Sequence, residues 1–149
     1  MEYLQQREQR KKRVKRNTKG FEKYFFITDR LPRKDILDLQ QKANLVLMVA
    51  HTNLKGIPSS KIYEYIGLRK KTLLAPGDNE ILNEIVDRCK IGYSANDVQS
   101  IEQILHQEMM VYESTQMIVP AGLEEVIEEY SGEHQVKILA QHLSKIILK

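Results

Sequence analysis

Five residues between positions 56 and 64 have the types and spacing to bind a phosphorylated ligand: Gly56, Ser59, Ser60, Lys61 and Glu64. Either serine can cap a helix, because a serine oxygen accepts a hydrogen bond from the free backbone N–H groups of the first turn. Such a turn presents unpaired donors and the positive end of the helix dipole, and Lys61 adds a full positive charge. The spacing predicts a helix that begins at Ser59 or Ser60 and can hold an anion at its start.

These five residues lie between two apolar runs. Residues 44–50 are apolar after the initial asparagine and show no alternation, which is typical of a strand buried on both faces. Residues 71–75 form a second buried run, and residues 91–93 read as a short edge strand. Strands that alternate with helices favour an open α/β sheet of parallel strands with right-handed crossovers. Ligands of such sheets lie beyond the carboxyl ends of the strands, where residues 56–64 leave the first run.

The other expected elements follow from periodicity and from capping residues. Two helices carry apolar stripes that we expect to face the core: Val98, Ile101, Ile104, Leu105 and Met109 in one, and Val136, Leu139, Ala140, Leu143, Ile146 and Ile147 in the other. We further expect a strand at 24–28 and helices at 2–16, from Pro32 to about Lys42, at 80–88, from Asn96 or Asp97 to about Glu113, and in two parts after Pro120, separated at 130–132.

Positive charge is concentrated at one end of the chain. Residues 1–24 hold nine Lys or Arg against three Asp or Glu, whereas the remaining residues hold 14 against 17. We therefore expect a basic helical segment at 1–23, followed by a single domain at 24–149. The cations of the basic segment suit the phosphates of nucleic acid or of anionic lipids. Aromatic residues do not interleave with these cations as base stacking requires, so we expect no binding of nucleic acid. Two interpretations of the segment stay open: it binds an anionic membrane surface, or it is a solvated helix.

Composition bounds the compartment and the cofactors. No apolar run approaches the roughly 20 residues that span a bilayer, and residues 7–16 are too basic for a signal-peptide core, so we expect a cytoplasmic protein. The single cysteine, Cys89, sits in a helical pattern that favours packing over reactivity. The histidines lack metal-ligand spacing with cysteines or carboxylates, so we expect no metal and no other cofactor.

The stretch from Ile57 to Ala75 resembles the Pro-Ser-Lys-x-x-Glu-Tyr-Leu segment of GT-B glycosyltransferases, in the large family often called group 1 or family 4. The similarity continues through residues 79–92 and 97–105 to Tyr130–His134, and covers roughly residues 24–148. In that family the segment builds the sugar-nucleotide donor site. The resemblance implies a Rossmann-like sheet flanked by helices, with C-terminal helices after it, as a C-terminal GT-B domain truncated at its N-terminus.

The resemblance also implies a function, glycosyl transfer from a nucleotide sugar to an acceptor that a missing N-terminal domain holds. In the family, the glutamate matching Glu64 accepts hydrogen bonds from the ribose hydroxyls, and backbone N–H groups near Ser59, Ser60 and Lys61 are candidates for the diphosphate. Gly56 stands where the family usually has a glutamate that approaches the donor sugar. The family's diphosphate-binding Arg and Lys have no match here, so no catalytic residue is assigned and the chain alone should be inactive.

Simpler interpretations remain beside these. Ordinary helix capping accounts for Ser59 and Ser60 equally well, and Glu64 would complement the helix dipole without any ligand. Enzymes of the family resembled often act on lipid-linked acceptors, which implies a peripheral position at the inner membrane face. The alternative function is a non-catalytic α/β module that binds a nucleotide or a partner protein.

Overall fold

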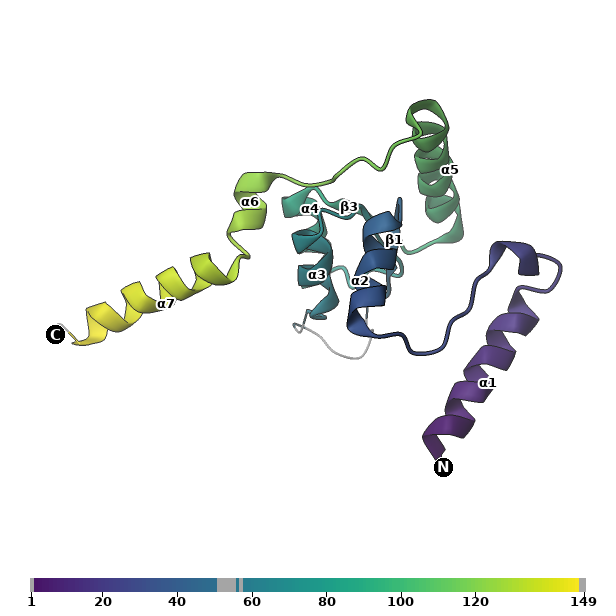
Figure 1. Cartoon of the computed structure of the whole chain (residues 1–149). Helices are drawn as coiled ribbons and strands as arrows, with labels where there is room; N and C mark the ends of the chain where they lie inside the picture. Colours follow the sequence, from purple (N-terminus) through teal and green to yellow (C-terminus); the bar gives the residue numbers. More distant parts are fainter. Residues whose placement is uncertain (1, 51–55, 57, 148–149) are drawn as a thin grey trace. The chain divides into compact units, whose positions relative to one another are not determined.

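The computed structural model of this chain describes residues 2–50, 56 and 58–147 (Figure 1). The chain forms two compact units, Met1–Ile36 and Leu37–Lys149. The domain boundary expected from the sequence, after residue 23, lies within the first of these units. The first unit contains helix α1 (Glu2–Asn17), the 3-10 helix η1 (Glu22–Tyr24) and the beginning of helix α2 (Arg33–Lys42).

The first unit confirms one expected element and corrects another. The basic helix at 2–16 is present as α1. The strand expected at 24–28 is wrong, because Tyr24 ends the 3-10 turn and residues 25–32 have no regular structure. A strand requires a hydrogen-bonded neighbour, and the backbone N–H of Phe25 instead donates to the Glu22 carbonyl at 3.1 Å. Composition alone therefore gave the wrong element here.

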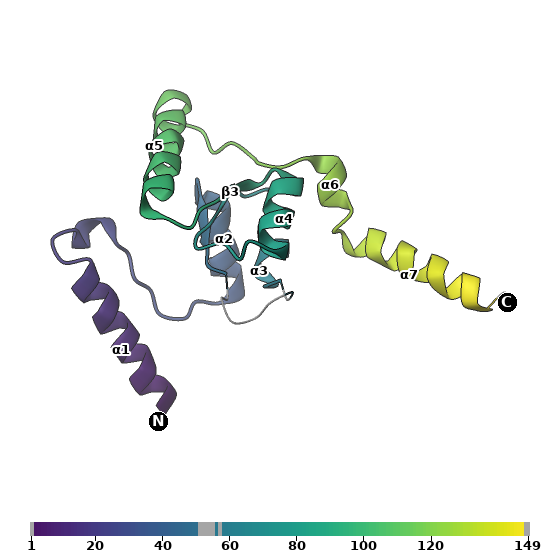
Figure 2. The same cartoon turned by 180° about the vertical axis from the view of Figure 1, so that it is seen from behind.

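The second unit contains a three-stranded sheet in the order β1-β2-β3. Both strand pairs are parallel, with Val46, Thr72 and Gly92 in register, which confirms the predicted α/β class and the open parallel sheet. Between and after the strands lie helices that Figures 1 and 2 show from opposite sides. The elements are β1 (Val46–Met48), α3 (Lys61–Gly67), β2 (Thr72–Leu74), α4 (Ile81–Cys89), β3 (Gly92–Ser94), α5 (Val98–Thr115), α6 (Glu124–Glu128) and α7 (Gly132–Ile147).

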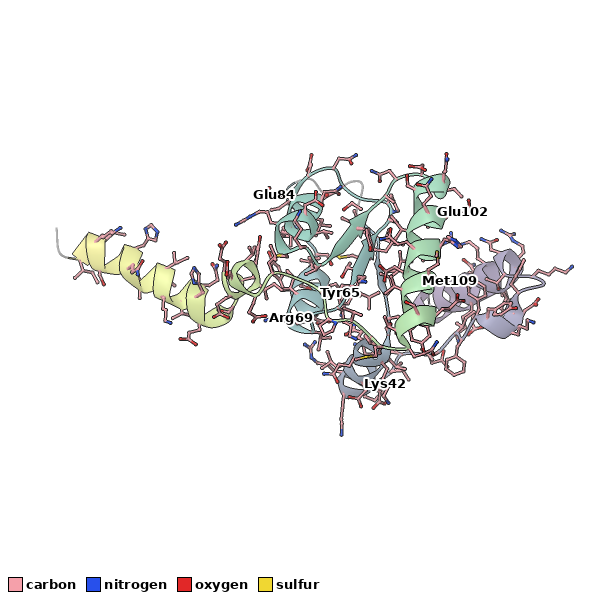
Figure 3. All side chains as sticks on the ribbon, turned by 90° about the horizontal axis from the view of Figure 1, so that it is seen from above. Lys42, Tyr65, Arg69, Glu84, Glu102 and Met109 are labelled. Carbon is pink, nitrogen blue, oxygen red and sulfur yellow. The ribbon has the colours of Figure 1, made fainter. Side chains whose placement is uncertain are left out.

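The main core lies between the sheet and helices α3 and α4. In α4 the apolar residues recur at intervals of three and four, which places Leu82, Ile85, Val86 and Cys89 on one buried face. Burial raises the pKa of the Cys89 thiol, so the packing role expected of this residue fits its surroundings. Figure 3 shows Tyr65 on the side of α3 that faces this core.

The opposite face of the sheet is only partly covered. Helix α5 packs on it through Ile101 and Ile104, against Leu73 and neighbouring small residues. The expectation that residues 44–50 are buried on both faces is wrong, since the Leu47 side chain is 62% exposed and only β2 is buried at every position. Of the expected inward stripe of α5, only Ile101 and Ile104 pack on the sheet, whereas Val98, Leu105 and Met109 are exposed, because the narrow sheet offers few partners on this face.

The apolar stripe of α7 is not buried as the sequence suggested. The helix forms at Gly132–Ile147, but none of its residues is buried. Val136 and Ile147 are among its most exposed apolar side chains. The core beside α3 and α4 is instead completed by Ile127 of α6, which residues 129–131 separate from α7, close to the break expected at 130–132. An amphipathic pattern specifies a helix, whereas burial also requires a neighbouring surface.

The first prediction concerns Gly92, where β3 approaches β2 most closely. A Cβ added at this position would lie 1.8 Å from the Thr72 carbonyl oxygen, which is backbone and cannot rotate away. We expect Gly92→Ala to lower the free energy of unfolding by about 2–4 kcal/mol, because β3 must shift. Gly67→Ala is the matched control, since nothing lies within 4 Å of its added Cβ. Urea unfolding that finds both variants equally stable would contradict the β2–β3 pairing.

Candidate functional site

The three carboxyl ends of the parallel strands meet at one edge of the sheet. The Ala50 N–H donates to the Pro76 carbonyl at 3.1 Å, and the Ala95 N–H donates to the Leu74 carbonyl at 3.0 Å, so the chain stays paired just beyond the strands. Helices α3, α4 and α5 all begin on this side, because each follows one strand. The edge therefore collects three helix starts, whose free N–H groups attract negative charge.

Helix α4 satisfies its start with its own carboxylate. Asp78 accepts hydrogen bonds from the backbone N–H groups of Glu80, Leu82 and Asn83 at 3.0, 3.0 and 3.1 Å. Burial by itself would raise the pKa of Asp78, but these N–H donors outweigh it and leave the pKa below its usual value. The positive end of α4 is thus already neutralised by Asp78.

The start of helix α5 is likewise capped by a carboxylate. Asp97 accepts a hydrogen bond from the Ser100 N–H at 2.8 Å and another from the Ser100 hydroxyl at 2.7 Å. The hydroxyl and the N–H of Ser100 both lower the pKa of Asp97. Of the two capping residues that the sequence left open, Asp97 is the cap and Asn96 is not.

Asn96 instead connects the loops that follow β2 and β3. Its amide oxygen accepts from the Gly77 N–H at 2.8 Å, and its amide nitrogen donates to the Asn79 side chain at 3.0 Å. The Asn79 N–H in turn donates to the Asn83 side chain at 3.0 Å. This chain of amides fixes the loops at the edge of the sheet, and no motif in the sequence pointed to it.

Helix α3 begins differently, and here lie the residues expected to bind a donor. The Ser59 hydroxyl accepts from the Lys61 N–H at a long 3.4 Å, whereas the side chain of Ser60, which is exposed and already helical, makes no capping bond. The prediction that either serine caps the helix therefore holds only weakly for Ser59 and is wrong for Ser60. Neither serine is acidic, so the start of α3 has no capping carboxylate of the kind found at the starts of α4 and α5.

The charged pair of the segment lies within the first turn of α3. Lys61 Nζ is 2.9 Å from the Glu64 carboxylate, and the Glu64 side chain is 20% exposed. The Lys61 side chain is 51% exposed, so a phosphate can reach its ammonium from solvent. Gly56 is more distant in the chain, and its N–H donates to the Glu80 carboxylate at 3.3 Å. His51, Lys55 and Ile57 lie outside the described residues.

This arrangement supplies two complementary groups close together. The Lys61 ammonium is a point charge suited to phosphate oxygens, and a carboxylate such as Glu64 is a pure acceptor for neighbouring hydroxyl groups. The structure places Ser59, Ser60, Lys61 and Glu64 in one continuous segment after β1. It connects Gly56 to the start of α4 rather than to that segment. No ligand is required to explain either contact.

Two hollows of the second unit involve none of the residues 56–64. One lies beside Lys71, whose ammonium is 2.9 Å from the Glu108 carboxylate. The Tyr93 hydroxyl donates to the same carboxylate at 2.6 Å, and burial together with that bond raises the pKa of Tyr93 to about 12. The other hollow is apolar, with a volume of about 420 Å³, and is lined by Leu45, Leu47, Leu73, Ala75, Ile101 and Leu105.

A metal site and a membrane-spanning helix each require features that the described part of the chain does not show. Within it, no three His, Cys, Asp or Glu side chains gather closely enough to hold a metal ion. None of its helices has the length and apolar character needed to cross a bilayer. The expectation of a metal-independent site stays a prediction.

The second prediction concerns the cap of α4. Asp78→Ala should lower the free energy of unfolding by about 1–2 kcal/mol at neutral pH, because three N–H groups lose their acceptor. A carboxyl group with a lowered pKa in the folded state stabilises the fold above its unfolded pKa, about 3.9, and loses this effect as the pH falls through the folded value. The difference from the parent chain should therefore shrink below about pH 4.

The control for this prediction is Asp87→Ala, which removes an exposed carboxylate near the other end of α4. A carboxylate is unfavourable at a helix C-terminus, so this change should be neutral or slightly stabilising. Urea unfolding at several pH values distinguishes the two variants. Equal stability of Asp78→Ala and the parent chain at pH 7 would contradict the proposed cap.

No family model, no curated protein and no solved structure matches this chain. The resemblance to GT-B glycosyltransferases expected from residues Ile57 to Ala75 therefore stays a prediction.

Proposed function

We propose that this chain is the donor-binding part of a GT-B glycosyltransferase, which transfers a sugar from a nucleotide-diphosphate donor. The observation that carries the proposal is the position of Lys61 and Glu64. They lie one helical turn apart on the helix that follows β1, at the carboxyl edge of a parallel sheet. This edge is where open α/β sheets bind their ligands. The same residues carry the resemblance between residues 57–75 and the donor segment of that family.

In this mechanism, each group of the segment has a separate task. The Glu64 carboxylate accepts hydrogen bonds from the two ribose hydroxyls, after its ion pair with Lys61 has opened. Lys61 and the backbone N–H groups near Ser59 and Ser60 hold the diphosphate. The chain provides no assigned catalytic residue. Another domain holds the acceptor, and the sugar is recognised by groups other than Gly56, which has no side chain.

The proposed location follows from the proposed acceptor. Enzymes of the family resembled often act on lipid-linked acceptors at the inner face of the membrane, and we place the chain there, in the cytoplasm. The partners of the chain are then a nucleotide sugar, an acceptor-binding domain and an anionic membrane surface. Nucleic acid is not among them.

A second candidate function is a non-catalytic module that binds a partner protein. One observation favours it, the apolar hollow on the open face of the sheet, where Leu47 of β1 is exposed. Exposed apolar surfaces of this kind mark interaction sites in many proteins. The two functions differ in the role of Glu64, whose carboxylate contacts a ligand only if the chain binds a nucleotide.

The third prediction tests the role of Glu64. Glu64→Ala should weaken the binding of a nucleoside diphosphate by about 1–3 kcal/mol, because a hydrogen-bonded charge that contacts the ribose is lost. The same variant frees Lys61, so its binding of inorganic pyrophosphate should not weaken. Isothermal titration calorimetry with both ligands separates the ribose contact from the diphosphate contact.

Glu84→Ala is the control for this measurement, since Glu84 lies on the outer side of α4 (Figure 3) and is exposed. It should leave both affinities unchanged. Unchanged affinity of Glu64→Ala for the nucleoside diphosphate would remove the ribose assignment and favour the protein-binding module.

The fourth prediction concerns activity. The 149-residue chain alone should not turn over any nucleotide sugar, because the proposed mechanism leaves the acceptor and the catalytic groups to another domain. Release of free nucleoside diphosphate, measured with a coupled assay across a set of common nucleotide sugars, checks this. Sustained release at enzyme-like rates would show that the chain holds catalytic residues that the resemblance does not assign.

A further inference from the structure

We propose that residues 11–27 form a docking surface for an anionic lipid bilayer. This surface lies wholly within the first compact unit, Met1–Ile36. It rests on the membrane location proposed above but not on the donor site, which belongs to the second unit. The two proposals therefore fail separately, one in a vesicle-binding measurement and the other in a nucleotide-binding measurement.

Positive charge is dense on this surface. Residues 11–23 hold seven Lys or Arg and one Glu. Lys11 is engaged within the unit, where its ammonium contacts Asp29 and lies 3.8 Å from Glu8. The other six are exposed: Lys12, Arg13, Lys15, Arg16, Lys19 and Lys23. Clusters of this density are attracted to the negative surface potential of anionic bilayers.

Exposed aromatic side chains follow these cations in the chain. Phe21, Tyr24, Phe25 and Phe26 are all exposed, and the Phe26 side chain is 93% accessible to solvent. Four large apolar side chains within six residues are unusual on the surface of a soluble protein and indicate an interaction site. Phe25 and Phe26 are available here because residues 25–32 form no strand.

Cations and apolar groups of this surface lie beside one another. Lys15 lines a hollow of about 480 Å³ together with Phe25 and Ile27. The ammonium of Lys23 lies 4.8 Å from the centre of the Tyr24 ring. Lysine beside aromatic residues matches the interfacial layer of a bilayer, where the rings enter the headgroup region and the ammonium groups stay with the phosphates.

The apolar composition favours a bilayer over nucleic acid. Ile27 and Val14 are exposed with the aromatic rings, and an aliphatic side chain gains nothing from base stacking. A bilayer takes up aliphatic and aromatic side chains alike, because both remove apolar surface from water. Single-stranded nucleic acid would use the cations and the rings but leave Ile27 and Val14 in water.

The first test is co-sedimentation of the full chain with vesicles. Vesicles in which about a third of the lipid is phosphatidylglycerol should bind the chain, and vesicles of phosphatidylcholine alone should not. Binding should fall as the salt concentration rises, because surface charges are screened. Equal binding to both vesicle types, or binding to neither, would overturn the proposal.

Variants locate the surface. Lys12→Gln with Arg16→Gln should weaken binding by roughly fivefold for each cation neutralised. Lys137→Gln with Lys145→Gln removes the same charge from exposed positions of α7 and should have little effect. Phe26→Ser should weaken binding about tenfold, whereas Met110→Ser, at an exposed position of α5, should not. An equal loss in a variant and its control would overturn the assignment to residues 11–27.

A tryptophan reporter checks insertion directly, because the chain contains no tryptophan. The emission of Phe26→Trp should shift to the blue on addition of anionic vesicles and should be quenched by lipids labelled in the headgroup region. Met110→Trp should show neither effect. An unshifted Phe26→Trp emission, or tighter binding of a single-stranded oligonucleotide than of anionic vesicles at the same salt, would overturn the proposal.

Discussion

The parallel pairing of β2 with both of its neighbours is the interaction on which the second unit depends. β2 is buried at all three positions and supplies Leu74 to the main core and Leu73 to the smaller core beneath α5. Its pairing with β3 requires that Gly92 has no side chain, since the Thr72 carbonyl occupies that space. Because both pairs are parallel, all three carboxyl ends reach one edge, and α3, α4 and α5 begin there.

The three helix starts at this edge differ in charge, and the difference decides which of them can receive an anion. Asp78 and Asp97 place a carboxylate at the starts of α4 and α5, so a phosphate there would meet a negative group that is already hydrogen-bonded. Helix α3 has serine hydroxyls instead of a capping carboxylate, and the one carboxylate of its first turn, Glu64, is paired with Lys61. We base the proposal of a donor site at α3 on this difference in capping and not on the fold alone.

Elements that depend on the local sequence pattern could be predicted from the sequence. Features that depend on contact with another part of the chain could not. The parallel strands that alternate with helices, the helix at about residues 80–88 and a cap at Asn96 or Asp97 follow from periodicity and turn residues. The strand expected at 24–28 needed a pairing partner, and the burial expected for Leu47 and for α7 needed a covering surface. The bridge through Asn96 joins loops 19 residues apart, and such a contact leaves no periodic trace.

The two units carry opposite charge, and this constrains how the chain could work at a membrane. Residues 1–36 hold 12 Lys or Arg against five Asp or Glu, whereas residues 37–149 hold 11 against 15. An anionic bilayer attracts the first unit and repels the second within a Debye length of about 8 Å at physiological salt. A nucleotide sugar is also anionic, so the net field of the second unit opposes its approach. The proposed donor binding therefore depends on the short-range contacts of Lys61 and the N–H groups of α3.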